Sequence, residues 1–112
     1  MKKLVALLLC LMMVVPATLA SAETADGKVL NIWCWNDEFQ SRFNAYYPEV
    51  KEIAEDKSTT TLNDGTIVKW TINPNEGNNY QNKLDEALRA QESAAADDKI
   101  DIFLIEADYA LK

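Results

Sequence analysis

Histidine is absent from this chain of 112 residues, and cysteine, glycine and proline are scarce. Without histidine, the chain has neither a Ser-His-Asp or Cys-His nucleophile nor a histidine-ligated metal site. Basic side chains are also few, because 11 Lys and Arg stand against 18 Asp and Glu and leave a net charge of −7. Nucleic-acid phosphates require a basic surface. We therefore expect no nucleic-acid partner, no metal ion and no cofactor.

The first 22 residues have the three parts of a secretory signal peptide. Lys2 and Lys3 precede an apolar run from Leu4 to Val15, and Ala20-Ser21-Ala22 forms a small-x-small cleavage site. The apolar run is shorter than the roughly 20 residues that a membrane-spanning helix needs. The sequence predicts cleavage before Glu23 and export of a soluble chain to the periplasm or the cell exterior.

Cleavage changes the composition of the chain. Removing 22 of the 112 residues leaves 90, and losing Lys2 and Lys3 changes the net charge from −7 to −9. Cys34 is then the one remaining cysteine, so the exported chain has no internal disulfide. It stands in an apolar run, and we expect it to be a buried small hydrophobic residue. Residues 23–28 are polar and read as a linker.

Hydrophobic periodicity predicts alternating strands and helices in the exported chain. We expect strands at residues 29–35, 66–72 and 100–105, and helices at residues 39–47, 49–56 and 80–98. Tyr80 belongs to the apolar stripe of the last helix and is expected in the core. Residues 58–65 read as a Thr-rich segment that ends in a turn. The order β-α-β-α-β predicts an α/β fold: an open, mostly parallel sheet with helical crossovers.

Polar and aromatic side chains follow each predicted strand. In open α/β sheets, ligands bind at the carboxyl ends of the strands, so residues 35–37, 73–79 and 106–109 should converge on one edge. Aromatic rings can pack on the C–H face of a sugar, and amides and carboxylates can bond its hydroxyls. Phosphate would need a Gly-rich loop or arginine instead. The candidate ligand-binding residues are Trp35, Asn36, Asp37, Asn75, Glu76, Glu106, Asp108 and Tyr109.

Each candidate also has a purely structural interpretation that the residues leave open. We interpret Trp33 and Trp35 as facing different layers, with one in the core and Trp35, at the end of its strand, as the ligand contact. Asp37 could cap a helix. The Asn-rich loop could be a solvated turn, and Glu106 with Asp108 could belong to a hydrated loop.

Four stretches of the chain carry a resemblance to a known family. They are Val29-Leu30-Asn31-Ile32-Trp33-Cys34-Trp35-Asn36-Asp37-Glu38-Phe39, Val68-Lys69-Trp70-Thr71-Ile72-Asn73-Pro74-Asn75, Asn79-Tyr80-Gln81-Asn82-Lys83-Leu84-Asp85 and Asp101-Ile102-Phe103-Leu104-Ile105-Glu106-Ala107-Asp108-Tyr109. With the signal peptide, their order and spacing resemble the start of a carbohydrate-type extracellular solute-binding protein of a bacterial ABC importer. The resemblance implies two α/β lobes that close on a sugar by hinge motion. It also implies a monomer without catalytic residues that delivers the sugar to a membrane permease.

The chain is short by comparison with that family, which has a second lobe and a hinge. We expect residues 29–112 to be the first part of lobe I of a periplasmic-binding-protein-like fold, in an N-terminal fragment whose last strand exposes apolar surface. Two other functions stay open. The chain could be a piece of a small secreted glycoside hydrolase, if Asp37 and Glu106 lie roughly 5–10 Å apart. It could also be a structural or interaction domain without a ligand.

Overall fold

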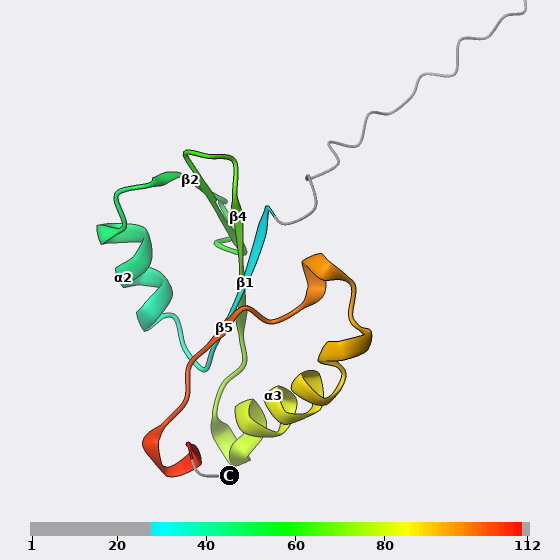
Figure 1. The fold of residues 1–112 in the computed structure, drawn as a ribbon. Coiled ribbons are helices and arrows are strands. Elements are labelled where there is room, and N and C mark those ends of the chain that lie inside the picture. Colours follow the sequence, from blue (N-terminus) through cyan, green and yellow to red (C-terminus); the bar gives the residue numbers. More distant parts are fainter. Residues whose placement is uncertain (1–27, 111–112) are drawn as a thin grey trace, which may run out of the picture.

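The computed structural model describes residues 28–110, which form a five-stranded sheet with a helix on each face (Figure 1). The predicted signal peptide and nearly all of the predicted linker lie outside the described residues. In chain order, the strands and α-helices are β1 (Val29–Cys34), α2 (Glu38–Tyr46), β2 (Val50–Ile53), β3 (Thr59–Leu62), β4 (Ile67–Ile72), α3 (Asn79–Arg89) and β5 (Ile102–Phe103). Short 3₁₀ helices are η1 (Glu76–Asn78), η2 (Gln91–Ser93), η3 (Ala96–Asp98) and η4 (Ala107–Tyr109).

The sheet has the strand order β2-β3-β4-β1-β5. Its middle is parallel, because β1 pairs with β4 from Val29 opposite Ile67 to Cys34 opposite Ile72, and pairs with β5 on its other side. β3 pairs with β2 on one side and with β4 on the other, both in antiparallel fashion. The predicted α/β class with helical crossovers is confirmed. The prediction of a mostly parallel sheet is wrong, because half of the strand pairs are antiparallel.

The antiparallel half arises from residues predicted as a helix and a loop. Residues 49–56, predicted as an acidic helix, instead contain β2, and the Thr-rich stretch after them forms β3. Three consecutive β-branched residues at 59–61 favour extended backbone. Gly65 adopts a φ of 86° in the turn between β3 and β4, a conformation that glycine permits. β2 lies at the sheet edge and is largely exposed, so it lacks the strand alternation that would have identified it.

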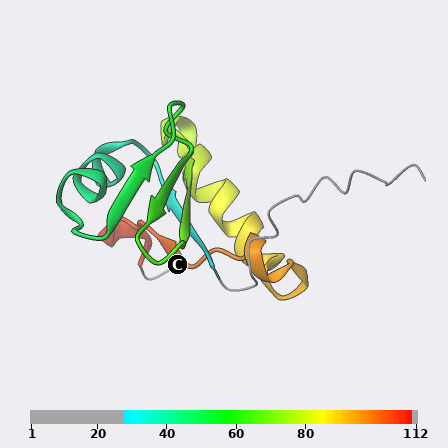
Figure 2. The same cartoon turned by 90° about the horizontal axis from the view of Figure 1, so that it is seen from above.

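The side chains of β1 divide between two layers. Leu30, Ile32 and Cys34 pack into the core under α2, whereas Trp33 and Trp35 pack into a second cluster under α3. The helices α2 and α3 accordingly lie on opposite sides of the sheet in Figure 1 and Figure 2. The interpretation that Trp33 and Trp35 face different layers is therefore wrong, because residues two apart on a strand point to the same face.

The core under α2 centres on Trp70, which is buried on β4. Phe39 and Phe43 of α2 meet its ring edge-on, with ring centroids 6.1 and 5.3 Å away. Its indole N–H donates to Thr60 Oγ1 at 3.0 Å, and the Thr60 hydroxyl donates to Asn44 Oδ1 at 2.7 Å. This chain of hydrogen bonds joins β4, β3 and α2.

Two predicted elements are shorter in the structure. The last helix ends at Arg89 rather than continuing to residue 98, because Ala94 and Ala95 adopt extended backbone between η2 and η3. The last strand, predicted at residues 100–105, shrinks to β5. Its first predicted residue, Ile100, instead exchanges two hydrogen bonds with the Gln91 side chain at 2.8 and 3.0 Å. The Gln91 side chain thus satisfies the backbone N–H and C=O of Ile100, which a neighbouring strand would otherwise pair with.

Cys34 is fully buried, which confirms the prediction that it is a core residue. Burial raises the pKa of its thiol from 9.0 to about 11. Tyr80 is also buried, as predicted. Its burial, and to a smaller extent the nearby Cys34, raises the pKa of its phenol from 10.0 to about 12. Both groups are therefore held in their neutral forms by the fold.

We expect the free energy of unfolding to fall as the pH rises above about 9. The unfolded chain releases these two protons near their ordinary pKa values of 9.0 and 10.0, while the folded chain keeps them up to about 11 and 12. The stabilisation that comes from the raised pKa values is thus complete below about pH 9 and is lost as the pH rises from 9 to about 12. Each group contributes roughly 2–3 kcal/mol at most.

Urea denaturation at a series of pH values from 8 to 12 measures this loss. The variant Cys34→Ala should lose the part of the alkaline slope that begins near pH 9 and keep the part that begins near pH 10, which comes from Tyr80. An alkaline slope that is the same in Cys34→Ala and the unsubstituted chain would contradict the assignment to the thiol.

Candidate ligand-binding site

The carboxyl ends of β1, β4 and β5 lie side by side at one edge of the sheet. The Leu104 N–H, just after β5, donates to Trp33 O of β1 at 3.0 Å. The Asn73 N–H, just after β4, donates to Cys34 O of β1 at 2.9 Å. The parallel pairing of the three strands thus brings the residues that follow each of them to one edge, as expected for an α/β sheet.

Tyr80 joins these strand ends from the first turn of α3. Its hydroxyl lies 2.7 Å from Leu104 O and 3.1 Å from Trp33 O, and its single proton is shared between these two backbone carbonyls. Its ring meets Trp35 edge-on, with centroids 5.6 Å apart and planes at 82°. Trp35 is therefore held between the end of β1 and the start of α3, with a half-buried ring.

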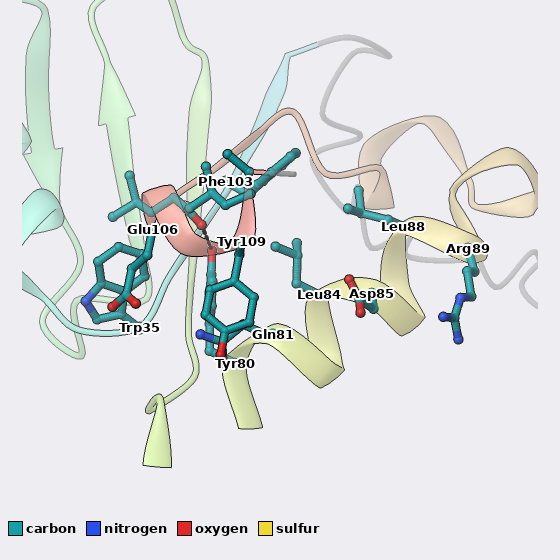
Figure 3. Close-up of a pocket in the computed structure, with 13 residues that line it drawn as sticks. Trp35, Tyr80, Gln81, Leu84, Asp85, Leu88, Arg89, Phe103, Glu106 and Tyr109 are labelled. Carbon is teal, nitrogen blue, oxygen red and sulfur yellow. Dashed lines mark hydrogen bonds between the residues drawn. The ribbon is translucent and has the colours of Figure 1, made fainter. Parts of the chain in front are cut away.

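A groove of about 490 Å³ runs between α3 and the segment after β5 (Figure 3). Three of the predicted ligand contacts line it: Trp35, the exposed carboxylate of Glu106, and the half-buried ring of Tyr109. The Tyr109 hydroxyl donates to Asn78 Oδ1 at 2.9 Å, which ties the loop after β5 to the loop after β4. The remaining lining residues are Tyr80, Gln81, Leu84, Asp85, Leu88, Arg89, Phe103, Leu104, Ile105 and Ala110.

A smaller hollow of about 220 Å³ lies on the α2 side of Trp35. The predicted residue Asn36 lines it together with Trp35, so the candidates divide between two hollows. Asn36 Oδ1 also accepts a hydrogen bond from the Glu38 N–H at 3.1 Å. Asp37 occupies the N-cap position of α2 but makes no side-chain cap hydrogen bond, so its alternative role as a capping side chain is not observed.

Four candidates line neither hollow. Asp37, Glu76 and Asp108 are exposed, and Asn75 is half-buried in the loop after β4. The side-chain oxygen of Asn75 is buried without a hydrogen-bond partner. The loop bends sharply after it, since Gly77 and Asn78 have φ values of 61° and 60°. Asn78 takes the N-cap position of α3, but its side chain accepts from Tyr109 instead of capping the helix.

None of the residues predicted to contact a ligand lies on α3, which forms one wall of the groove. Tyr80, which the sequence predicts in the core, forms the inner part of this wall together with Leu84 and Leu88. Gln81, Asp85 and Arg89 also line the groove. They recur at a spacing of four beside these three residues, which is the signal that could have identified them. Arg89 adds a cation to the aromatic, amide and carboxylate side chains that the sequence predicts for the site.

No protein-family model, no curated protein and no solved structure matches this chain. Within residues 28–110, no helix is long and apolar enough to cross a membrane. In the same part of the chain, no three acidic or cysteine side chains are grouped so that they could hold a metal ion. The chemistry of the groove is therefore the basis for any inference about function.

Proposed function

We propose that this chain is the substrate-binding component of a carbohydrate ABC importer, which captures a sugar outside the membrane and delivers it to a permease. In this proposal, residues 29–112 supply the sugar-contacting edge of the first lobe of a periplasmic-binding-protein-like fold. The observation that carries the proposal is the groove at the carboxyl ends of β1 and β5, where Trp35, Glu106 and Tyr109 lie together.

The groove offers the groups that a neutral sugar needs. The rings of Trp35 and Tyr109 can pack on the apolar C–H faces of a pyranose, and the Glu106 carboxylate can accept hydrogen bonds from its hydroxyls. Figure 3 shows these three residues at one end of the groove and Arg89 at the other. The aromatic end thus combines apolar and acidic groups, which favours a neutral polyhydroxyl ligand over an anion.

The exposed edge of the sheet supports the proposed lobe. Ile102, Phe103 and Ile105, on and just after β5, are 41%, 38% and 48% exposed. The opposite edge strand, β2, carries the exposed charges of Lys51 and Glu52, a common protection against unwanted strand pairing. An apolar and uncharged edge strand is normally paired or covered. In the proposed lobe, a further strand pairs with β5 and covers this surface.

Titration of the exported chain with a panel of mono- and oligosaccharides, followed by NMR, tests the proposal. Because one lobe contacts one face of a ligand, we expect a dissociation constant of about a millimolar for the preferred sugar. Trp35→Ala should weaken binding about tenfold, since it removes a ring that packs on the sugar. The matched control is Tyr46→Ala, which removes an aromatic ring that is 81% exposed on α2 and should leave binding unchanged.

Three outcomes would contradict parts of this proposal. Equal weakening by Trp35→Ala and Tyr46→Ala would contradict the placement of the sugar in the groove. Micromolar affinity in this chain would contradict the need for a second lobe. Turnover of a chromogenic glycoside, lost in Asp37→Asn or Glu106→Gln, would indicate a glycoside hydrolase instead.

A further inference from the structure

Gln81 has a buried hydrogen-bond acceptor that no group within residues 28–110 satisfies. The residue is 7% exposed, and its Oε1 atom has no hydrogen-bond partner in that part of the chain. Among the described residues, Asn75 Oδ1 is the other buried side-chain atom in this condition, and Asn75 does not line the groove. Buried polar groups are nearly always paired, because an unpaired one retains the free-energy penalty of leaving water. An exception at the wall of a groove therefore requires an explanation.

We propose that the side-chain carbonyl of Gln81 is the groove's acceptor for a ligand hydroxyl. This inference rests on the proposed function and deepens it, because it places one hydroxyl of the sugar at the first turn of α3. Gln81 lines the same groove as Trp35 and Tyr109. A hydroxyl is a neutral donor, so it satisfies Oε1 without burying a charge.

Neighbouring polar groups have partners inside the protein. The Tyr80 hydroxyl donates to two backbone carbonyls, and the Asn79 amide donates to Pro74 O at 3.1 Å. These groups hold the start of α3 against the ends of β1 and β4. The unsatisfied acceptor of Gln81 therefore stands on a fixed element, which suits a residue that selects for a donor at a defined position.

The Gln81 oxygen is enclosed by protein atoms, so a small movement must accompany binding. Gln81 and Tyr109 both line the groove. Tyr109 belongs to the three-residue helix η4, and its hydrogen bond to Asn78 is exposed to solvent.

A pair of glutamine-to-leucine variants tests this inference. Gln81→Leu removes an unsatisfied polar group, so the Tm should stay the same or rise, while sugar binding should weaken about tenfold. The matched control is Gln40→Leu. Gln40 is 4% exposed, and its amide donates to Lys57 O at 2.6 Å. Because it has a partner, its loss should lower the Tm by about 5 °C and leave binding by the folded chain unchanged.

The two readouts separate the failure of this inference from failure of the proposed function. A Tm lowered by Gln81→Leu as much as by Gln40→Leu would show that Gln81 has a structural partner and would overturn the inference. Sugar binding that Gln81→Leu retains in full would also overturn the inference and leave the proposed function standing. Absence of binding by every sugar in the unsubstituted chain would overturn both.

Discussion

Replacing Trp70 with alanine should lower the free energy of unfolding by about 3–5 kcal/mol. The ring is 8% exposed and meets Phe39 and Phe43 edge-on, so its removal leaves a cavity under α2. It also removes the donor to Thr60, which is fully buried and is itself bonded to Asn44. Small domains have about 5–15 kcal/mol of stability in total. We therefore expect this variant to be largely unfolded at moderate urea concentrations.

Trp70→Phe separates the ring from the hydrogen bond. It keeps an aromatic ring between Phe39 and Phe43 but leaves the Thr60 hydroxyl without its donor. We expect a loss of about 1–3 kcal/mol, clearly less than for alanine. Urea denaturation followed by circular dichroism measures both variants. Equal losses for phenylalanine and alanine would show that the hydrogen bond, and not the packing, is the main contribution of Trp70.

Tyr80→Ala should have an effect of similar size on the opposite face of the sheet. Tyr80 is 1% exposed, and we expect its loss to lower the free energy of unfolding by about 3–5 kcal/mol. The variant also removes the ring that meets Trp35 and the hydroxyl that joins the ends of β1 and β5. Sugar binding should therefore weaken together with stability, because Trp35 is no longer held in place.

Tyr80→Phe isolates the role of the hydroxyl. The Trp33 carbonyl keeps the hydrogen bond from the Leu104 N–H at 3.0 Å, whereas the Leu104 carbonyl loses the 2.7 Å bond from Tyr80. We expect a loss of about 1–2 kcal/mol and the disappearance of the alkaline slope that begins near pH 10. A loss as large as that in Tyr80→Ala would contradict the view that the ring contributes most.

The parts of the fold with strong periodicity could be predicted from the sequence. β1, β4 and α3 are buried on at least one face, and their apolar residues repeat as strands and helices require. β2 has no such signal, because Val50 and Ile53 stand three apart in an exposed strand. That spacing is equally typical of one turn of helix, and only the pairing with β3 decides between the two.

The edge of the sheet at which the parallel strands end could be predicted, but the lining of the groove could not. Parallel pairing fixes where the strand ends meet, and this places Trp35, Glu106 and Tyr109 at one groove. The contribution of Gln81 and Arg89 depends on how α3 is rotated against the sheet. That rotation is set by the packing of Tyr80 and its neighbours, which the pattern of a single helix does not contain.

The most direct test of the proposed sugar site reads the tryptophan indole N–H signals of the chain during titration with the sugar panel. Trp35 lines the groove, whereas Trp70 is buried in the core on the opposite face, where its indole is bonded to Thr60. We expect one sugar to shift the Trp35 signal saturably while the Trp70 signal stays unmoved. A Trp35 signal that no sugar moves, or equal shifts at Trp35 and Trp70, would contradict binding in the groove.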